Sequence, residues 1–178
     1  MTTPAPSWPT PPEIAGPAPG VRFAGNGARL GAYLLDVILI GAIVSLFVVL
    51  LAVPLAGDAL RIAIVDPGRF QDPATWTELG GSIVLFVAGT TIISLLALLY
   101  FPFFWARGGQ TPGMRVAGIR VVNDRDGSRI GWGAAILRLI GYWISGAVFY
   151  LGFIWILVDA RRRGWHDLIA GTCVIAVR

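Results

Sequence analysis

The chain has 178 residues, of which 56% are hydrophobic and only 13% are charged, and its formal net charge is +4. Charged residues make up about a quarter of an ordinary soluble domain, so this composition excludes that class and places the chain in a lipid bilayer. Cys173 is the single cysteine, which excludes an intrachain disulfide and a cysteine-based metal cluster. In a membrane protein the basic excess predicts contact with anionic headgroups, and we expect no binding of nucleic acid.

Residues 1–20 are rich in proline and contain neither a basic residue nor an apolar stretch. A secretory signal has both, so this segment is predicted to be a disordered tail instead. It is either a solvated leader without its own function, which we favour, or a docking strip for a proline-binding partner. Residues 21–178 form the predicted membrane domain.

Three runs carry no charged side chain: residues 37–57, 79–106 and 139–158. A helix rises about 1.5 Å per residue, so about 20 residues cross the roughly 30 Å of hydrocarbon in a bilayer. Each run is therefore long enough to span. The sequence predicts an all-α membrane protein, a small helical bundle of three to four hydrophobic segments.

The arginines set the expected orientation, because cytoplasmic loops carry the excess of positive residues. The loop after the first run carries two arginines and four acidic residues: Arg61, Arg69, Asp58, Asp66, Asp72 and Glu78. The loop after the second run carries six arginines and two aspartates: Arg107, Arg115, Arg120, Arg125, Arg129, Arg138, Asp124 and Asp126. We therefore expect the second loop and the N-terminus to be cytoplasmic. Arginine without lysine, with abundant Ala, Gly and Pro, is typical of a GC-rich bacterial genome, so the membrane is predicted to be a bacterial plasma membrane.

The third run conflicts with that orientation if it crosses once, because residues 161–163 are three adjacent arginines that would then lie outside. Gly141, Gly146 and Gly152 interrupt the run at places where a helix can bend or break. We therefore favour a split segment, in which two short helices enter the membrane and return to the same side, rather than a single membrane-spanning helix. The bend would have to be buried against the other spans, because lipid-exposed irregular backbone is too costly.

The segment MRVAGIRVV, followed by NDRDG and SRIGW, is typical of a β-hairpin, with Asp126-Gly127 in the tight turn. The tail GTCVIAVR has β-branched residues and would add a third strand. Strands pair only on one side of a membrane. The sequence therefore predicts a short cytoplasmic β-hairpin, and it supports the split third run.

Asp36 lies inside the first apolar segment, where an unpaired carboxylate near the bilayer centre would cost about 2.5 to 3.5 kcal/mol. We therefore expect Asp36 to face protein. Arg29 lies seven residues earlier, within about 20° of the same helix face but about 10 Å away along the axis. It either reaches toward Asp36 or holds a partner at the membrane surface.

Two more charged residues flank the third run. Arg138 precedes it, and Asp167 follows it in RGWHDLIAGT. Asp167 either caps a turn or pairs with Arg29 or Arg138, and spacing alone favours none of these. His166 is the only histidine, which makes a poor metal site, so no metal or other cofactor is expected. We favour an interfacial polar role for His166 over a titrating switch.

The chain resembles the RDD family of small bacterial membrane proteins, named for one arginine and two aspartates. Arg29, Asp36 and Asp167 match these three positions, and the likeness extends over roughly residues 21–177. The segment GGQTPGMRVAGIRVVNDRDG also resembles the family's Gly-x-Thr-x-Gly-basic segment, carried here by Gly109, Thr111, Gly113 and Arg115. The resemblance implies a polar constellation between helices and membrane transport of unidentified ligands, with cation/proton exchange among the suggestions.

Two functions remain open. Asp36 could bind a proton or cation and release it as the bundle rearranges, or the charged residues could fix helix register in a non-catalytic scaffold or assembly partner. Direct contact with arginine would keep Asp36 ionised as a brace, whereas arginine contact with Asp167 alone would leave Asp36 free to titrate. We favour transport, with Arg29, Asp36 and Asp167 as the polar core and Arg138 as an accessory. A homo-oligomer or a membrane protein partner would widen the cramped pathway of so small a chain. No catalytic set is visible, so we expect no enzyme.

Overall fold

The computed structural model describes residues 20–177, so the predicted tail lies, except for Gly20, outside the described residues. The described chain divides into two compact units. The first contains the chain up to Tyr33 together with the residues from Pro102 onward, and the second is Leu34–Phe101. We call them the polar unit and the hairpin unit.

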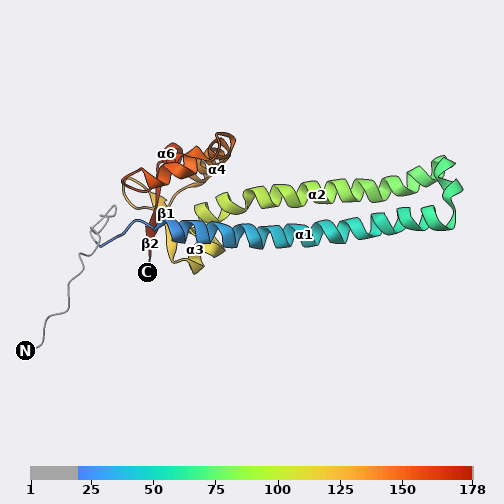
Figure 1. Cartoon of the computed structure of the whole chain (residues 1–178), viewed down its shortest axis with the longest axis horizontal. Coiled ribbons are helices and arrows are strands. Elements are labelled where there is room, and N and C mark those ends of the chain that lie inside the picture. The colour runs from blue at the N-terminus through green and yellow to red at the C-terminus, as the bar shows by residue number, and fades with distance from the viewer. Residues whose placement is uncertain (1–19, 178) are drawn as a thin grey trace, which may run out of the picture. The chain divides into compact units, whose positions relative to one another are not determined.

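Two long helices account for the first two apolar runs (Figure 1). Helix α1 is Asn26–Val65 and helix α2 is Pro73–Gly108, and the 3-10 helix η1, Pro67–Gln71, connects them. Both helices are long and apolar enough to cross a membrane, and the most apolar stretch of each is not buried within the protein. Outward-facing side chains such as Ile38, which is 67% exposed, therefore suit a lipid environment. The expected all-α membrane protein class is confirmed.

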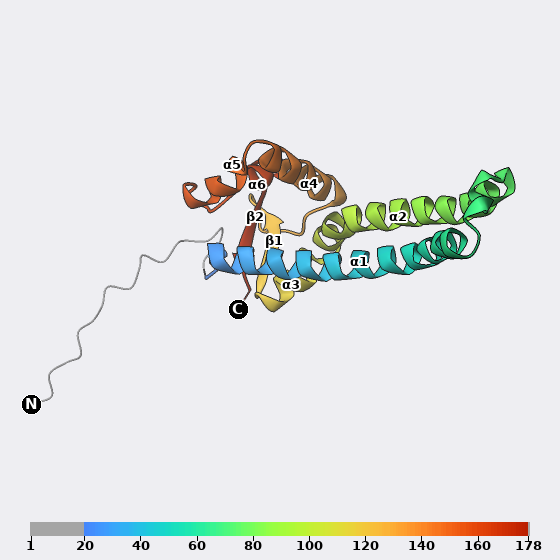
Figure 2. The same ribbon diagram turned by 45° about the vertical axis from the view of Figure 1, so that its right-hand side comes forward.

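Within the hairpin unit, α1 and α2 run antiparallel, side by side (Figure 2). Leu51 packs where a Cβ on Gly89 would stand, so the glycine allows the two helices to approach closely. With 40 residues, α1 is about 60 Å long, about twice the hydrocarbon thickness. It is therefore long enough to cross the apolar layer with its charged far end, from Asp58 onward, outside that layer.

The third apolar run is not one continuous helix. Helix α4, Trp132–Ala147, is followed after a short break by helix α5, Leu151–Ile154, and the 3-10 helix η2, Trp155–Leu157. The chain bends by 111° at this break, where Phe149 and Tyr150 adopt left-handed backbone angles with φ of 48° and 61°. The run has the predicted short helices, but the bend falls after Ala147 and not at a glycine. Phe149 is 86% exposed, so the bend is not buried, contrary to our expectation.

A small antiparallel sheet is formed by β1, Ile119–Asn123, and β2, Thr172–Ala176. Val121 lies opposite Val174, and both are almost fully buried. Ala24 N–H donates to the Val174 carbonyl, and Phe23 forms an isolated bridge with Ile175, so the chain before α1 also joins β2.

The expected short antiparallel sheet is confirmed, and the tail segment joins it as expected, but the partner strand predicted for the hairpin, in SRIGW, is wrong. The turn forms as expected, with Gly127 at φ 69° donating to the Asn123 carbonyl. Residues 128–131 then form no strand, because α4 begins at Trp132 and leaves too little extended chain to pair. The distant tail segment, which is more apolar, pairs with β1 instead.

Candidate functional site

Asp167 lies in the first turn of helix α6, Trp165–Ala170, and its side chain is completely buried. Its Oδ2 atom accepts the backbone N–H of Gly164 at 3.2 Å, which caps the helix. A carboxylate in the first turn also suits the positive end of the helix. The helix cap therefore helps to fix the position of this carboxylate.

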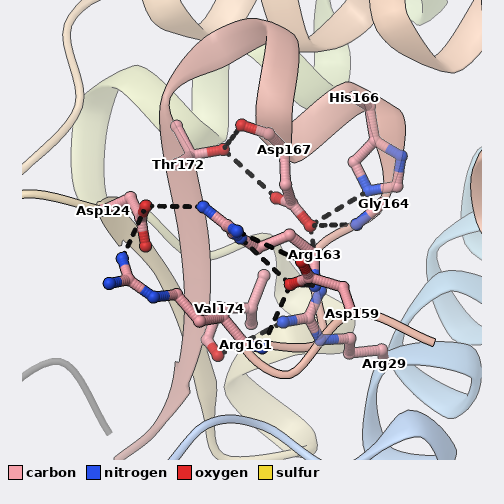
Figure 3. Close-up of polar contacts among 10 residues, drawn as sticks. All are labelled: Arg29, Asp124, Asp159, Arg161, Arg163, Gly164, His166, Asp167, Thr172 and Val174. Carbon is pink, nitrogen blue, oxygen red and sulfur yellow. Dashed lines mark hydrogen bonds and ion pairs between the residues drawn. The ribbon is translucent and has the colours of Figure 1, made fainter. Parts of the chain in front are cut away.

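Two guanidinium groups converge on Asp167 from distant parts of the chain (Figure 3 shows Arg29). Arg138 Nη1 lies 2.7 Å from Oδ1, and Arg29 Nη1 lies 3.0 Å from Oδ2. The Arg138 side chain is 1% exposed and that of Arg29 is 10% exposed. We call these three residues the Arg29–Asp167–Arg138 cluster.

Strand β2 supplies further partners for the cluster. Thr172 Oγ1 donates to Asp167 Oδ1 at 3.1 Å and accepts from Arg138 Nη1 at 3.0 Å. Arg29 Nη2 donates to the Val174 carbonyl at 3.4 Å. The cluster therefore ties α1, α4, α6 and β2 together within the polar unit, while the Arg138 guanidinium also lies 4.8 Å above the Trp105 ring.

The charges around Asp167 determine its protonation. Burial alone would raise the pKa of this carboxyl, but the charge of Arg138, the neighbouring His166 and the charge of Arg29 hold the pKa well below its usual range. Asp167 is therefore ionised at neutral pH. Two guanidinium groups against one carboxylate leave the cluster with one positive charge in excess.

We expected His166 to lie at the membrane interface, but it is buried in the protein beside Asp167 and only 2% exposed. Its Nε2 lies 3.4 Å from Asp167 Oδ2, and its ring lies 4.3 Å from Tyr142 and 5.3 Å from Phe153, centroid to centroid. Burial lowers the pKa of His166, so the imidazole is neutral at neutral pH and donates to Asp167 through Nε2–H.

Asp36 belongs to the hairpin unit and is 1% exposed. The Tyr100 hydroxyl, on helix α2, donates to Asp36 Oδ1 at 2.8 Å. Of the four residues predicted for a polar core, the structure brings together Arg29, Arg138 and Asp167, and it pairs Asp36 with Tyr100. Sequence reasoning missed Tyr100, although it is a polar hydroxyl inside an uncharged run.

A second ionic network lies nearer the surface of the polar unit (Figure 3). Asp124 Oδ2 accepts from Arg161 Nη1 at 3.1 Å and from Arg163 Nη1 at 2.9 Å. Asp159 Oδ2 accepts from Arg163 Nε at 3.0 Å. These contacts join the two ends of the third apolar run, and sequence reasoning missed them because Asp124 and the arginines are far apart in the chain.

Within residues 20–177 no group of three or more His, Cys, Asp or Glu side chains is placed to hold a metal ion. An open groove of about 420 Å³ runs along α2, lined by Thr90, Thr91, Ser94, Leu95 and Leu98. Its three hydroxyls bond to carbonyls of their own helix. The groove therefore offers few free polar groups to a ligand.

Comparison with known sequences gives one family match, described as the RDD family, over residues 23–171. That range contains Arg29, Asp36, Arg138 and Asp167. The chain is 35% identical over 91 residues to the uncharacterized protein YxaI of Bacillus subtilis, covering 51% of this chain and 59% of that protein. It is 40% identical over 93 residues to the uncharacterized protein YckC of the same species, covering 46% and 58%.

The chain is also 29% identical over 84 residues to the proline-rich antigen homolog of Mycobacterium tuberculosis, covering 46% of this chain and 35% of that protein. The matches therefore span less than two thirds of each of these relatives. No solved structure matches.

Proposed function

The chain belongs to the RDD family, and from this membership we propose that it is a multi-pass membrane protein that transports an ion or a small solute. Asp36 is the binding carboxylate in this proposal. The observation that carries it is the separation of the acidic groups: both buried arginines donate to Asp167, whereas Asp36 receives a hydroxyl hydrogen bond. The two aspartates are therefore suited to different tasks.

The surroundings of Asp36 support a binding role. A carboxylate inside an apolar helix costs about 2.5 to 3.5 kcal/mol on insertion scales, so such residues mark ion and proton pathways in membrane proteins. Tyr100 donates its hydroxyl to Asp36, and the same hydroxyl oxygen can also accept a hydrogen bond or help coordinate a small cation. The two guanidinium groups already neutralise Asp167 and stabilise its ionised form, which leaves Asp167 less suited than Asp36 to bind a proton or cation.

The second candidate function is a non-catalytic membrane scaffold or assembly partner. The Arg29–Asp167–Arg138 cluster favours it, because a buried carboxylate with two arginines is a fixed brace and fixes the register of the elements it joins. In this role the partners would be anionic headgroups and another copy of the chain or a different membrane protein.

Ion flux in proteoliposomes tests the transport proposal. Asp36→Asn removes the charge at nearly constant shape and is expected to reduce pH-dependent flux to the level of empty vesicles. Tyr100→Phe removes only the hydroxyl and is expected to reduce flux partially. Asp66→Asn, at an exposed aspartate just after α1, serves as the matched control and should leave flux unchanged.

Two outcomes decide against transport. If the parent protein shows no flux, or if Asp36→Asn and Asp66→Asn behave alike, the scaffold becomes the better account. Size-exclusion chromatography of each variant checks assembly, so a loss of flux with intact assembly separates chemistry from folding.

We also propose that the α4–α5 segment is re-entrant and that the N-terminus is cytoplasmic in a bacterial plasma membrane. The ends of the segment support this: β1, before it, pairs with β2, after it, and Asp124 bonds to Arg161 and Arg163. Paired ends must lie on one side of the bilayer. A segment that leaves and returns to one side does not cross.

Cysteine labelling in intact cells tests this topology. Arg69→Cys and Arg162→Cys should react from opposite sides of the membrane, and Arg125→Cys from the same side as Arg162→Cys. The native Cys173 should contribute little background, because it is buried and burial raises the pKa of its thiol to about 12. Reaction of Arg69→Cys and Arg162→Cys from one side would contradict the re-entrant arrangement.

A further inference from the structure

The N-terminal end of helix α1 is a concentration of positive potential. The helix begins at Asn26 after Gly25, which has no side chain to accept its first N–H groups, and its first turn contains no acidic residue. The N–H groups of residues 26–28 have no acceptor within the helix. They and the aligned peptide dipoles place about half a positive charge at this end.

A guanidinium group is held against this positive end. Arg161 and Arg163 are paired with acidic side chains. Arg162, which lies between them and has a left-handed backbone with φ of 54°, does not share these pairs. Its Nη1 lies 3.7 Å from the position that a Cβ on Gly25 would occupy. Among residues 20–177, no carboxylate or other acceptor pairs with the Arg162 side chain. A cation beside a helix N-terminus is unfavourable unless an anion lies with it.

Arg29 adds an independent sign of a missing anion. Its side chain is nine-tenths buried, yet its Nε has no hydrogen-bond partner. Arg29 is the fourth residue of α1 and its backbone N–H donates to the Gly25 carbonyl, so this side chain leaves from the first turn of the helix. The Arg29–Asp167–Arg138 cluster also carries one more positive than negative charge. The charge balance is therefore incomplete at this end of α1.

We propose that this end of α1 binds a phosphate group, with Arg162 and the N–H groups of residues 26–28 as its main donors and Arg29 Nε completing the site. Helix N-termini are suited to phosphate because the free N–H groups point at it, and arginine donates charge-assisted hydrogen bonds to phosphate oxygens. The group can belong to an anionic lipid or to free phosphate. The helix surface becomes apolar from Leu30, which is 60% exposed, so a lipid headgroup would sit where the hydrocarbon layer begins.

Lipid retention by the full-length protein in detergent tests the site. Native mass spectrometry should detect bound phosphatidylglycerol, and Arg162→Gln is expected to weaken its binding roughly tenfold, as for the loss of a hydrogen bond to a charged group. Arg162→Lys should restore part of the affinity. Arg125→Gln removes the same charge from an exposed arginine of the polar unit and is expected to leave binding unchanged. Phosphatidylcholine, whose headgroup has no net charge, serves as the control for lipid retention that does not depend on headgroup charge.

A second arm titrates inorganic phosphate, followed by isothermal calorimetry. Arg162-dependent binding of phosphatidylglycerol alone assigns the site to a lipid headgroup, and Arg162-dependent binding of inorganic phosphate assigns it to free phosphate. Equal effects of Arg162→Gln and Arg125→Gln in both arms would overturn the proposal. Melting temperatures of the variants check folding, and none of these measurements depends on transport.

Discussion

Asp167→Asn is expected to lower the free energy of unfolding by about 3–5 kcal/mol, because it removes the carboxylate that lies between two buried guanidinium groups. The neutral amide keeps the shape and one acceptor oxygen. Its NH₂ group replaces an oxygen that accepts from Arg138 and Thr172 or from Arg29 and Gly164, so donor now faces donor. Removing one charged partner from a buried ionic cluster destabilises the fold much more than replacing all the charged residues of the cluster by apolar side chains.

Denaturation of the detergent-solubilised protein, followed by tryptophan fluorescence, measures this loss. The matched control is Asp126→Asn, at an exposed aspartate that accepts from the Ser128 N–H and can still do so as an amide. The control should unfold with the parent. If Asp167→Asn does so too, the cluster contributes nothing to stability and the brace is ruled out.

The same carboxylate predicts a pH dependence. The pKa of Asp167 in the folded protein lies well below its value near 3.9 in an unfolded chain. The ionised form is thus favoured by folding, so its stabilisation is complete above about pH 4 and is lost as the pH falls through the folded-state value. We expect acid to destabilise the parent strongly and Asp167→Asn only weakly over that range. Parallel acid denaturation of the two proteins would contradict this.

Gly141→Ala is expected to destabilise the fold by about 3 kcal/mol, the upper end of the usual range for overpacking. The added Cβ would lie 2.5 Å from His166 Cα and 2.9 Å from its Cβ, so α4 and α6 would have to separate. Backbone cannot move aside as a side-chain tip does. Because Arg138 is on α4 and Asp167 is on α6, separation would also lengthen their ion pair.

Gly133→Ala gives a matched control on the same helix, because nothing lies within 4 Å of the added Cβ. Alanine favours helix over glycine by up to about 1 kcal/mol, so this variant should be as stable as the parent or slightly more stable. The two substitutions are chemically identical and should differ in sign. Thermal unfolding of both decides the point: equal melting temperatures would show that α4 and α6 do not pack closely at Gly141.

The long helices were predictable because uncharged runs of spanning length leave few alternatives. Their extent was not. α1 continues past Pro54 and the charged residues that end the apolar run, as far as Val65, because helix propensity does not stop where hydrocarbon stops. Hydropathy locates the membrane-facing part of a helix, and hydrogen bonding along the backbone decides where the helix ends.

The polar contacts show a different limit of sequence reasoning. For Asp167 we left open a helix cap, a pair with Arg29 or a pair with Arg138, and the structure has all three together. Spacing treats such roles as alternatives, whereas a carboxylate has four lone-pair sites and accepts several donors at once. The choice of the tail as the partner of β1 was open for a related reason, since no local pattern reports a pairing across some fifty residues.

The bonding of α1 to the end of the chain has a consequence for biogenesis. Arg29 leaves the ribosome 138 residues before Asp167, and Ala24 far earlier than its acceptor Val174. Both long helices can therefore enter the bilayer before Asp167, the counter-ion of Arg29, has been synthesised. The ion pair between Arg29 and Asp167 can therefore form only after the long helices have been synthesised. Cellular quality control would meet new copies of the protein before this ion pair has formed.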